Sequence, residues 1–322
     1  SIVPADLSYF TVSAADTSTV TTGVSRAITV AAYDVYNNVK TNTGTINVTF
    51  SGANSSPSGQ AATCSNASSA DVAFGTATSL TFNSSGQAAT TLKLYKAETA
   101  AIKATSGSAV TSSTNDLDLT VKHNVADHTK FTANLPSPVN VGTSFNFDTT
   151  LGVVDQYDNV CDGANGATAY GGTKTVSWTL SGTANSPDGT QTDVFVTSSG
   201  FTSGLSTTTL SSTLYRAQAT TISANIASLP KTAANVASNS VTVNAGAINK
   251  LWFSQQPSTS CVATQVLAQQ PKVAVSDAYG NAATSASGTI ALRASTTTGA
   301  FTAAANGVLS GTSLSVALAN GE

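Results

Sequence analysis

Apolar and polar residues alternate in short runs along the whole chain, and turn-forming residues separate one run from the next. The clearest runs cover residues 28–34, 45–50 and 117–121. A period of two residues predicts β-strands with one buried face. A helix is arguable only at 92–101, where Thr and Ile residues favour a strand instead. About seven such strands in each ~120 residues predict an all-β chain of Greek-key β-sandwiches.

Other runs extend this prediction over most of the chain. Strands are expected at 7–12, 78–82, 88–94, 130–133, 145–155, 176–180, 194–196, 241–243, 251–253, 273–277, 288–292 and 314–318. Between the runs at 45–50 and 78–82, residues 51–69 are mostly polar, and we expect a loop there.

Two sequence repeats divide the chain into similar units. The pattern Asp-x-Tyr-x-Asn begins at residues 34, 155 and 277, so its copies start 121 and 122 residues apart. Residues 94–104 match residues 214–224, which lie 120 positions later. We therefore predict three domains at 1–123, 124–246 and 247–322. The third lacks counterparts of 102–104 and 117–121, so we expect it to be incomplete by about two strands.

The composition limits which cellular compartments and which classes of partner are plausible for this chain. Charged residues make up 9% of the 322 residues, against roughly 25% in an average soluble protein. The net charge of -3 argues against nucleic acid or an anionic membrane as a partner. No apolar run has the length of a membrane span, and the chain contains no Met. We expect a mature extracellular or cell-surface chain from which any signal peptide has been removed.

The residues around the third repeat permit a family comparison. Val-x-Val-x-Asp-x-Tyr-Gly-Asn at 273–281, followed by Gly-x-Ile-x-Leu at 288–292, resembles bacterial immunoglobulin-like domains of the invasin and intimin type. The resemblance covers the whole chain, although Asn37 and Asp158 stand at the Gly position in the first two copies. It implies tandem immunoglobulin-like sandwiches, as in surface adhesins, S-layer proteins and secreted filaments. It implies no ligand.

The repeated Asp has two interpretations. The alternation of its strand predicts that its side chain points toward the core, where an unpaired charge is costly. One interpretation is a structural cap: the carboxylate accepts turn amides, the Asn tolerates a left-handed conformation, and the Tyr closes the end of the sandwich. These residues are Asp34, Tyr36, Asn38, Asp155, Tyr157, Asn159, Asp277, Tyr279 and Asn281.

The other interpretation is a calcium site where two domains meet. The second copy fits best, because Asp155, Asp158 and Asp162 are close in sequence. Asp116 or Asp118 could add oxygen ligands from the first domain, and calcium takes six to eight of them. A zinc site at His123, Asp127 and His128 is a further alternative to solvated histidines in a linker. No other cofactor is expected.

The three cysteines occupy non-equivalent positions in the repeats. In an immunoglobulin-like topology, Cys64 would lie at the C-terminal pole of the first domain. Cys161 would lie at the N-terminal pole of the second, facing it. An oxidising compartment would then favour a disulfide between Cys64 and Cys161, and two free thiols are the alternative. Cys261 is left over in either case, either free or paired with another chain or with a further domain.

The sequence contains none of the catalytic motifs for which it was searched. It lacks a Gly-x-Ser-x-Gly elbow, a His-Glu-x-x-His pair, a phosphate-binding loop and a Cys-x-x-Cys pair. We therefore expect a protein that is not an enzyme. One explanation of the short third domain is that this chain is only part of a longer protein. One hypothesis of function is a rod that assembles with copies of itself into a surface layer or fibre, with a neighbour's strand completing the third domain. The alternative is the stalk of a cell-surface adhesin whose binding tip is not in this chain.

Overall fold

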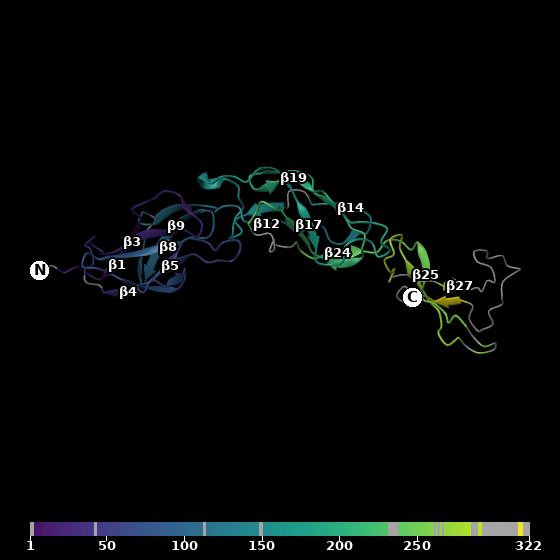
Figure 1. Cartoon of the computed structure of the whole chain (residues 1–322). Coiled ribbons are helices and arrows are strands. Elements are labelled where there is room, and N and C mark those ends of the chain that lie inside the picture. Colours follow the sequence, from purple (N-terminus) through teal and green to yellow (C-terminus); the bar gives the residue numbers. More distant parts are fainter. Residues whose placement is uncertain are drawn as a thin grey trace.

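The computed structural model describes residues 3–41, 44–111, 114–147, 151–230, 238–260, 262, 265, 267–284, 289–291 and 315–317. Within this part, the regular structure is β-strand apart from one short 3-10 turn, η1 (Ala164–Gly166). The strands follow one another along an elongated molecule (Figure 1). The all-β prediction is confirmed. None of the described segments is a helix long and apolar enough to cross a membrane. We call the predicted ranges 1–123, 124–246 and 247–322 domains 1, 2 and 3.

Two sheets build domain 1. One has the order β1-β3-β8-β5-β6 and the other β2-β11-β9-β4-β7, with β10 beside β9. The pair β2 and β11 is parallel and the other pairs in these two sheets are antiparallel. The strands are β1 (Leu7–Ser13), β2 (Val20–Thr21), β3 (Ser25–Asp34), β4 (Thr45–Ser51), β5 (Thr63–Ser65), β6 (Asp71–Ala73), β7 (Ala77–Thr81), β8 (Gln87–Lys93), β9 (Thr99–Ser106), β10 (Ala109–Val110) and β11 (Leu117–Lys122).

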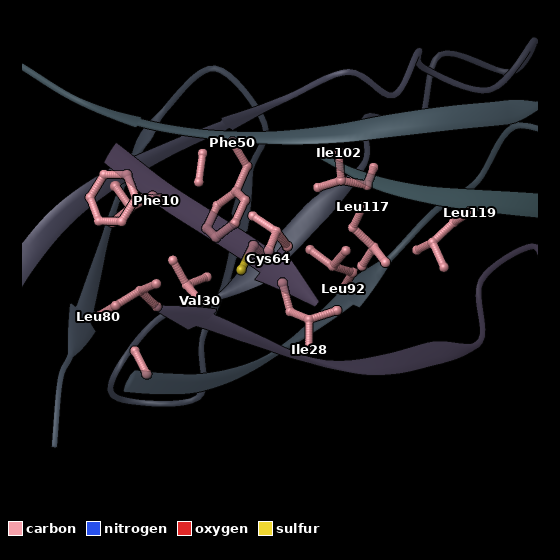
Figure 2. Packing of buried hydrophobic residues seen from close by; sticks show 14 of the residues in the cluster. Phe10, Ile28, Val30, Phe50, Cys64, Leu80, Leu92, Ile102, Leu117 and Leu119 are labelled. Atoms are coloured by element: carbon pink, nitrogen blue, oxygen red, sulfur yellow. The ribbon is translucent and has the colours of Figure 1, made fainter. Parts of the chain in front are cut away.

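The core of domain 1 lies between these sheets (Figure 2). Phe10 and Val30 come from one sheet, Phe50 and Ile102 from the other, and all four are 0% exposed. On β3 the even-numbered positions from Ile28 to Asp34 point inward, as the alternation predicts. A closed two-layer core of this kind fixes where each strand ends, and therefore where the turns at the two poles lie.

Domain 2 has smaller sheets around a second core. Their orders are β12-β15-β20-β19-β16, β13-β24-β22, β14-β21-β18 and β17-β23. The strands are β12 (His128–Phe131), β13 (Val139–Asn140), β14 (Ser144–Asn146), β15 (Leu151–Val154), β16 (Gly172–Thr175), β17 (Ser177–Leu180), β18 (Val194–Phe195), β19 (Ser198–Thr202), β20 (Leu205–Ser206), β21 (Ser211–Thr213), β22 (Gln218–Thr220), β23 (Ile222–Asn225) and β24 (Val241–Asn244).

Aliphatic side chains and the rings of Phe145, Phe147 and Phe201 fill this second core, and further aromatic rings pack against it. Leu151, Leu210 and Ile222 are 0% exposed. The Trp178 ring stacks on Phe195 with 5.4 Å between centroids, and the indole nitrogen donates to the Val196 carbonyl at 2.8 Å. Each of the two cores draws its residues from one predicted domain range.

In domain 3 the structure describes two antiparallel pairs, β25 (Lys250–Gln255) with β26 (Lys272–Ser276) and β27 (Thr289–Ala291) with β28 (Ser315–Ala317). Leu251 on β25 pairs with Val275, as Phe10 pairs with Ala32 in domain 1. Phe10 is 0% exposed, but Leu251 is 59% exposed. The side of β25 that carries the core in domain 1 therefore faces solvent here.

Two short stretches differ from the sequence prediction. The expected polar loop at 51–69 contains β5, and β6 follows it, so the first sheet extends past β8. Residues 92–101 run from the end of β8 into β9 and contain no helix. β9 pairs with both β11 and β4, and this central place in the sheet overrides any local helical tendency.

Candidate functional site: the joints between domains

The three Asp-x-Tyr-x-Asn turns share one hydrogen-bonding pattern around a buried carboxylate. Asp34 Oδ1 accepts the backbone amides of Tyr36 at 2.9 Å and Asn38 at 2.8 Å. Asp155 and Asp277 accept the equivalent amides at 2.9 to 3.0 Å. Each carboxylate is at most 1% exposed. The amides compensate for its loss of hydration, which makes each turn a rigid cap at the strand end.

The fourth residue of each turn adopts the left-handed conformation. Asn37 has φ 65°, Asp158 has φ 67° and Gly280 has φ 84°. We expected the final Asn of the pattern to take this conformation, and that prediction was wrong by one position. Asn, Asp and Gly are the residues that tolerate positive φ best, which explains why the fourth position varies among these three.

The second oxygen of each carboxylate holds the chain that leads into the domain. Asp155 Oδ2 accepts the amide of Asn124 at 2.9 Å, and Asp277 Oδ2 accepts that of Gly246 at 2.9 Å. Ala5 donates to Asp34 Oδ2 at 2.9 Å in the same way. Burial raises the pKa of Asp34, but its hydrogen bonds outweigh burial and hold the pKa at about 2, below the ordinary 3.8. Each carboxylate therefore fixes its linker to its turn.

The Asn of the second turn reaches across to domain 1. Asn159 Nδ2 donates to the Tyr95 carbonyl at 2.9 Å, and Asn159 Oδ1 accepts the Ala97 amide at 2.8 Å. Thr22 of domain 1 also donates its hydroxyl to Asp155 Oδ2 at 2.8 Å. Asn159 is 4% exposed. Both groups of its amide are thus satisfied inside the boundary between the domains, which we call the first joint.

The third turn repeats these contacts with domain 2. Asn281 Nδ2 donates to the Tyr215 carbonyl at 2.9 Å, and its Oδ1 accepts the Ala217 amide at 2.7 Å. Asn281 is 3% exposed. We call this boundary the second joint. The repeat at 94–104 and 214–224, which in the sequence marked only homology, supplies the partners of the Asp-x-Tyr-x-Asn turn.

The Tyr of the turns at 155–159 and 277–281 packs on a glycine and on a second tyrosine. At the first joint a Cβ added to Gly23 would overlap the Tyr157 hydroxyl, and the ring meets Tyr95 edge-on at 4.9 Å between centroids. Burial raises the pKa of Tyr157, and the nearby Tyr95 and Asp155 add to the effect. Gly23 has φ 76°, so both the turn and the close approach require glycine.

The second joint has the same arrangement of rings. Tyr279 lies against Gly142, where a Cβ would overlap its hydroxyl, and meets Tyr215 edge-on at 5.0 Å. Gly142 has φ 68°. Gly23 and Gly142 are not among the residues predicted from the sequence. They lie in turns of different local sequence, so only their place relative to Tyr95 and Tyr215 identifies them.

A loop of sequence Ser-Pro-x-Gly completes each joint, at 56–59 and 186–189. The Ser58 amide donates to the Tyr157 carbonyl at 3.2 Å, and the Asp188 amide donates to that of Tyr279 at 3.3 Å. This repeated tetrapeptide is a signal of the joints that can be read in the sequence. We call residues 22–23, 56–59 and 95–97 the receiving face of domain 1, and residues 141–142, 186–189 and 215–217 that of domain 2.

Side chains next to each receiving face hold the chain that leads into its Ser-Pro-x-Gly loop. Glu98 accepts the Asn54 amide at 2.7 Å and its side chain at 2.8 Å. Burial raises the pKa of Glu98, but the bonds from Asn54 and Lys96 outweigh it and lower the pKa. Gln218 takes the place of Glu98 at the second joint, 120 residues later in the chain. Its Oε1 accepts the Thr183 amide at 3.2 Å, and its Nε2 donates to the Thr183 carbonyl at 2.7 Å.

An ion pair adds to the second joint. Lys250 on β25 approaches Asp188 Oδ2 at 3.0 Å, so domain 3 is tied to the Ser-Pro-x-Gly loop of domain 2. Hydrogen bonds from Thr190, Lys250 and Ser186 hold the pKa of Asp188 well below its ordinary value. The carboxylate therefore stays charged at neutral pH.

The sequence and the structure were both compared with known proteins. No protein-family profile and no curated protein matches the sequence. The structure is similar to that of the Escherichia coli adhesin FdeC, with 18% identity, a TM-score of 0.33, and coverage of 92% of this chain and 84% of that one. The D00-D0 domains of intimin match with 14% identity and a TM-score of 0.30, over 73% of this chain and 98% of that one.

A third similar structure comes from a surface-layer protein. Domains 1-6 of SbsC match with 17% identity and a TM-score of 0.24, over 89% of this chain. This chain corresponds to 34% of the length of that structure.

The acidic residues proposed for calcium have other partners. Asp155 accepts hydrogen bonds from the amides of the turn and the linker. Asp158 contacts His128 Nε2 at 2.9 Å and Lys130 Nζ at 2.7 Å. Asp162 accepts the Ala164 amide at 2.8 Å. Of the other two donors considered, Asp116 lies 3.7 Å from Lys103, and Asp118 is exposed. Within the described ranges, no three His, Cys, Asp or Glu side chains are placed to hold a metal ion, so the structure does not assemble the predicted donor set.

Of the residues proposed for zinc, His128 and Asp127 are in contact, but His123 has other partners. His128 is 2% exposed and lies between Asp127 at 2.9 Å and Asp158 at 2.9 Å. A carboxylate oxygen thus faces each ring nitrogen of His128, so both nitrogens have partners within domain 2. His123 instead approaches the Asn124 carbonyl with Nδ1 at 2.6 Å. The His128 cluster fixes the start of β12 beside the first joint.

The predicted disulfide is wrong, because both cysteines are free and buried. Cys64 lies on β5 inside the core of domain 1, with Sγ 3.3 Å from Thr90 Oγ1, rather than in a loop at the pole. Cys161 follows the second turn and is 1% exposed. Burial raises the pKa of Cys64 to about 11 and that of Cys161 to about 12. Cys261 lies outside the described residues.

Proposed function

We propose that this protein is a non-enzymatic extracellular structural protein whose tandem immunoglobulin-like domains form a stiff rod that assembles into a surface layer or fibre. The observation that carries the proposal is the repetition of one joint. Asn159 and Asn281 make the same pair of interdomain bonds, and Tyr157 and Tyr279 pack on equivalent glycines. Contacts repeated at successive boundaries hold neighbouring domains in one orientation, which a regular assembly needs.

The composition of the surface supports self-association. Lys and Arg together number 13 in 322 residues. Charged side chains, lysine above all, normally prevent sheet edges from pairing with other chains. A surface in which Ser, Thr and Ala replace these charges can pack against copies of itself.

The partner that we propose is another copy of this chain, which supplies a strand to domain 3. An apolar face of β25 supports this partner, because Leu251 is 59% exposed and Phe253 is 46% exposed. Phe10 and Val12 occupy the same positions of β1, at 0% and 5% exposure. A strand added from a neighbour would cover this face.

Negative-stain microscopy of the purified protein tests the proposal. Regular filaments or sheets are expected, and Phe253→Glu should abolish them because it places a charge on the face to be covered. The matched control is Trp252→Glu, since Trp252 is 51% exposed on the opposite side of β25. Isolated rods at every concentration, with both variants unchanged, would refute assembly. They would favour the alternative, the stalk of an adhesin whose binding tip is not in this chain.

A further inference from the structure

The Asp-x-Tyr-x-Asn turn of domain 1 has no receiving face docked on it in the described structure. Tyr36 is 76% exposed and Val35 is 65% exposed, and Asn38 is exposed as well. The equivalents of Asn38, which are Asn159 and Asn281, are 4% and 3% exposed. The turns at 155–159 and 277–281 are therefore buried in joints, whereas the turn at 34–38 presents the same groups to solvent.

This exposed turn already has the docked conformation. Asn38 Nδ2 donates to Asp34 Oδ2 at 3.0 Å, as Asn281 does to Asp277 Oδ2 at 2.9 Å. Asn37 is left-handed like Asp158, and the Tyr9 hydroxyl donates to Asn37 Oδ1 at 3.0 Å. Docking would require no rearrangement of the backbone, so the face is preorganised for the contact that its two equivalents make.

The chain ahead of this turn also follows the course of a linker. The amides of Asn124 and Gly246 bind the carboxylate of a residue 31 positions later, and the Ala5 amide binds one 29 positions later. At both joints, the peptide that makes this bond comes directly from the domain that supplies the receiving face. The Ala5 bond thus marks the place where a preceding domain would connect.

We propose that the turn at 34–38 is half of a third joint, and that it binds an immunoglobulin-like domain joined covalently on the N-terminal side of Ala5. The partner must present what domains 1 and 2 present. It needs a left-handed glycine against Tyr36, a Tyr-x-Ala segment whose carbonyl and amide bind Asn38, and a Ser-Pro-x-Gly loop whose amide meets the Tyr36 carbonyl. The proposal does not depend on whether the rod assembles or serves as a stalk.

An extended protein tests this directly. Residues 3–123 carrying Tyr36→Phe are placed ahead of Ala5, so that Ala5 follows His123 as Asn124 does in the natural chain and the natural Tyr36 is the one left to label. Nitration of tyrosines by tetranitromethane is then followed by mass spectrometry. We expect labelling of Tyr36 to fall from the level of an exposed tyrosine to the level of Tyr157 and Tyr279 in the same molecule.

The control carries Gly23→Ala in the added copy alone and should restore labelling of Tyr36. Alkylation of the added Cys64 reports whether that copy has folded. If it has not, residues 124–245 joined to Ala5 supply the second receiving face instead. Labelling of Tyr36 that stays unchanged in the folded extended protein overturns the proposal. Protection of Tyr36 that rises with concentration in the natural chain also overturns it, because another copy would then be the occupant.

Discussion

The hydroxyl of Tyr157 lies in the space that a Cβ on Gly23 would occupy. The two residues belong to different domains, and Tyr279 repeats the relationship with Gly142. Each glycine is left-handed, at φ 76° and 68°. A residue without a side chain is therefore required twice for the same reason, and the fit of ring to turn determines how closely the domains approach.

Gly23→Ala should open the first joint while domain 1 stays folded. The added methyl group displaces the Tyr157 ring, and the left-handed backbone adds about 1–2 kcal/mol of strain. The Ala97 amide donates a hydrogen bond to Asn159 Oδ1 across the joint, so its hydrogen exchange should become markedly faster. Gly75→Ala is the matched control, because Gly75 has φ 84° and its Cβ would meet nothing within 4 Å. Equal exchange of Ala97 in the two variants would contradict this account of the joint.

Asn159→Ala should weaken the coupling of domains 1 and 2. It removes two interdomain hydrogen bonds, which together contribute about 1–3 kcal/mol. Asn38→Ala removes the equivalent side chain where no domain is docked. It should therefore lower the free energy of unfolding by about 1–3 kcal/mol less than Asn159→Ala does. Urea titrations give both free energies of unfolding. Equal losses in the two variants would show that the interdomain bonds add nothing.

Acid should weaken domain 1 through Asp34. Its pKa of about 2 in the folded state lies below the ordinary 3.8, so its stabilising effect is complete above pH 4. The effect is lost as the pH falls from about 4 to about 2. The thermal midpoint should fall over this range in the natural protein and less in Asp34→Asn. Asp118→Asn, at an exposed carboxylate, is the control and should fall like the natural protein.

The pattern of the sequence predicted the strands that alternate cleanly and the turn that follows β3. It missed β5 and β6, because three residues are too few to display a period of two. It placed the Asp-x-Tyr-x-Asn turn at a pole but could not pair Asn159 with Tyr95, since the two are 64 residues apart and on different domains. The disulfide prediction failed for a related reason. A loop was assumed around Cys64, whereas β5 carries this residue into the core.

Cys64 and Cys161 should resist alkylation in the folded protein. Each is 1% exposed, and burial raises the pKa values to about 11 and 12, so little thiolate forms at neutral pH. Mass spectrometry after iodoacetamide should find both unmodified until urea unfolds the chain. Recovery of a peptide pair linked through these two cysteines under non-reducing conditions would disprove the assignment as free thiols.

The rigidity of the first joint can be measured as a distance distribution. Spin labels at Asn47→Cys on β4 and Thr179→Cys on β17, in a Cys261→Ser background, report on two exposed positions in domains 1 and 2. Double electron–electron resonance should give one narrow distance peak for the natural joint. The peak should broaden when Gly23→Ala and Asn159→Ala are added. A broad distribution with the natural joint would contradict the central claim that these contacts hold the domains in one orientation.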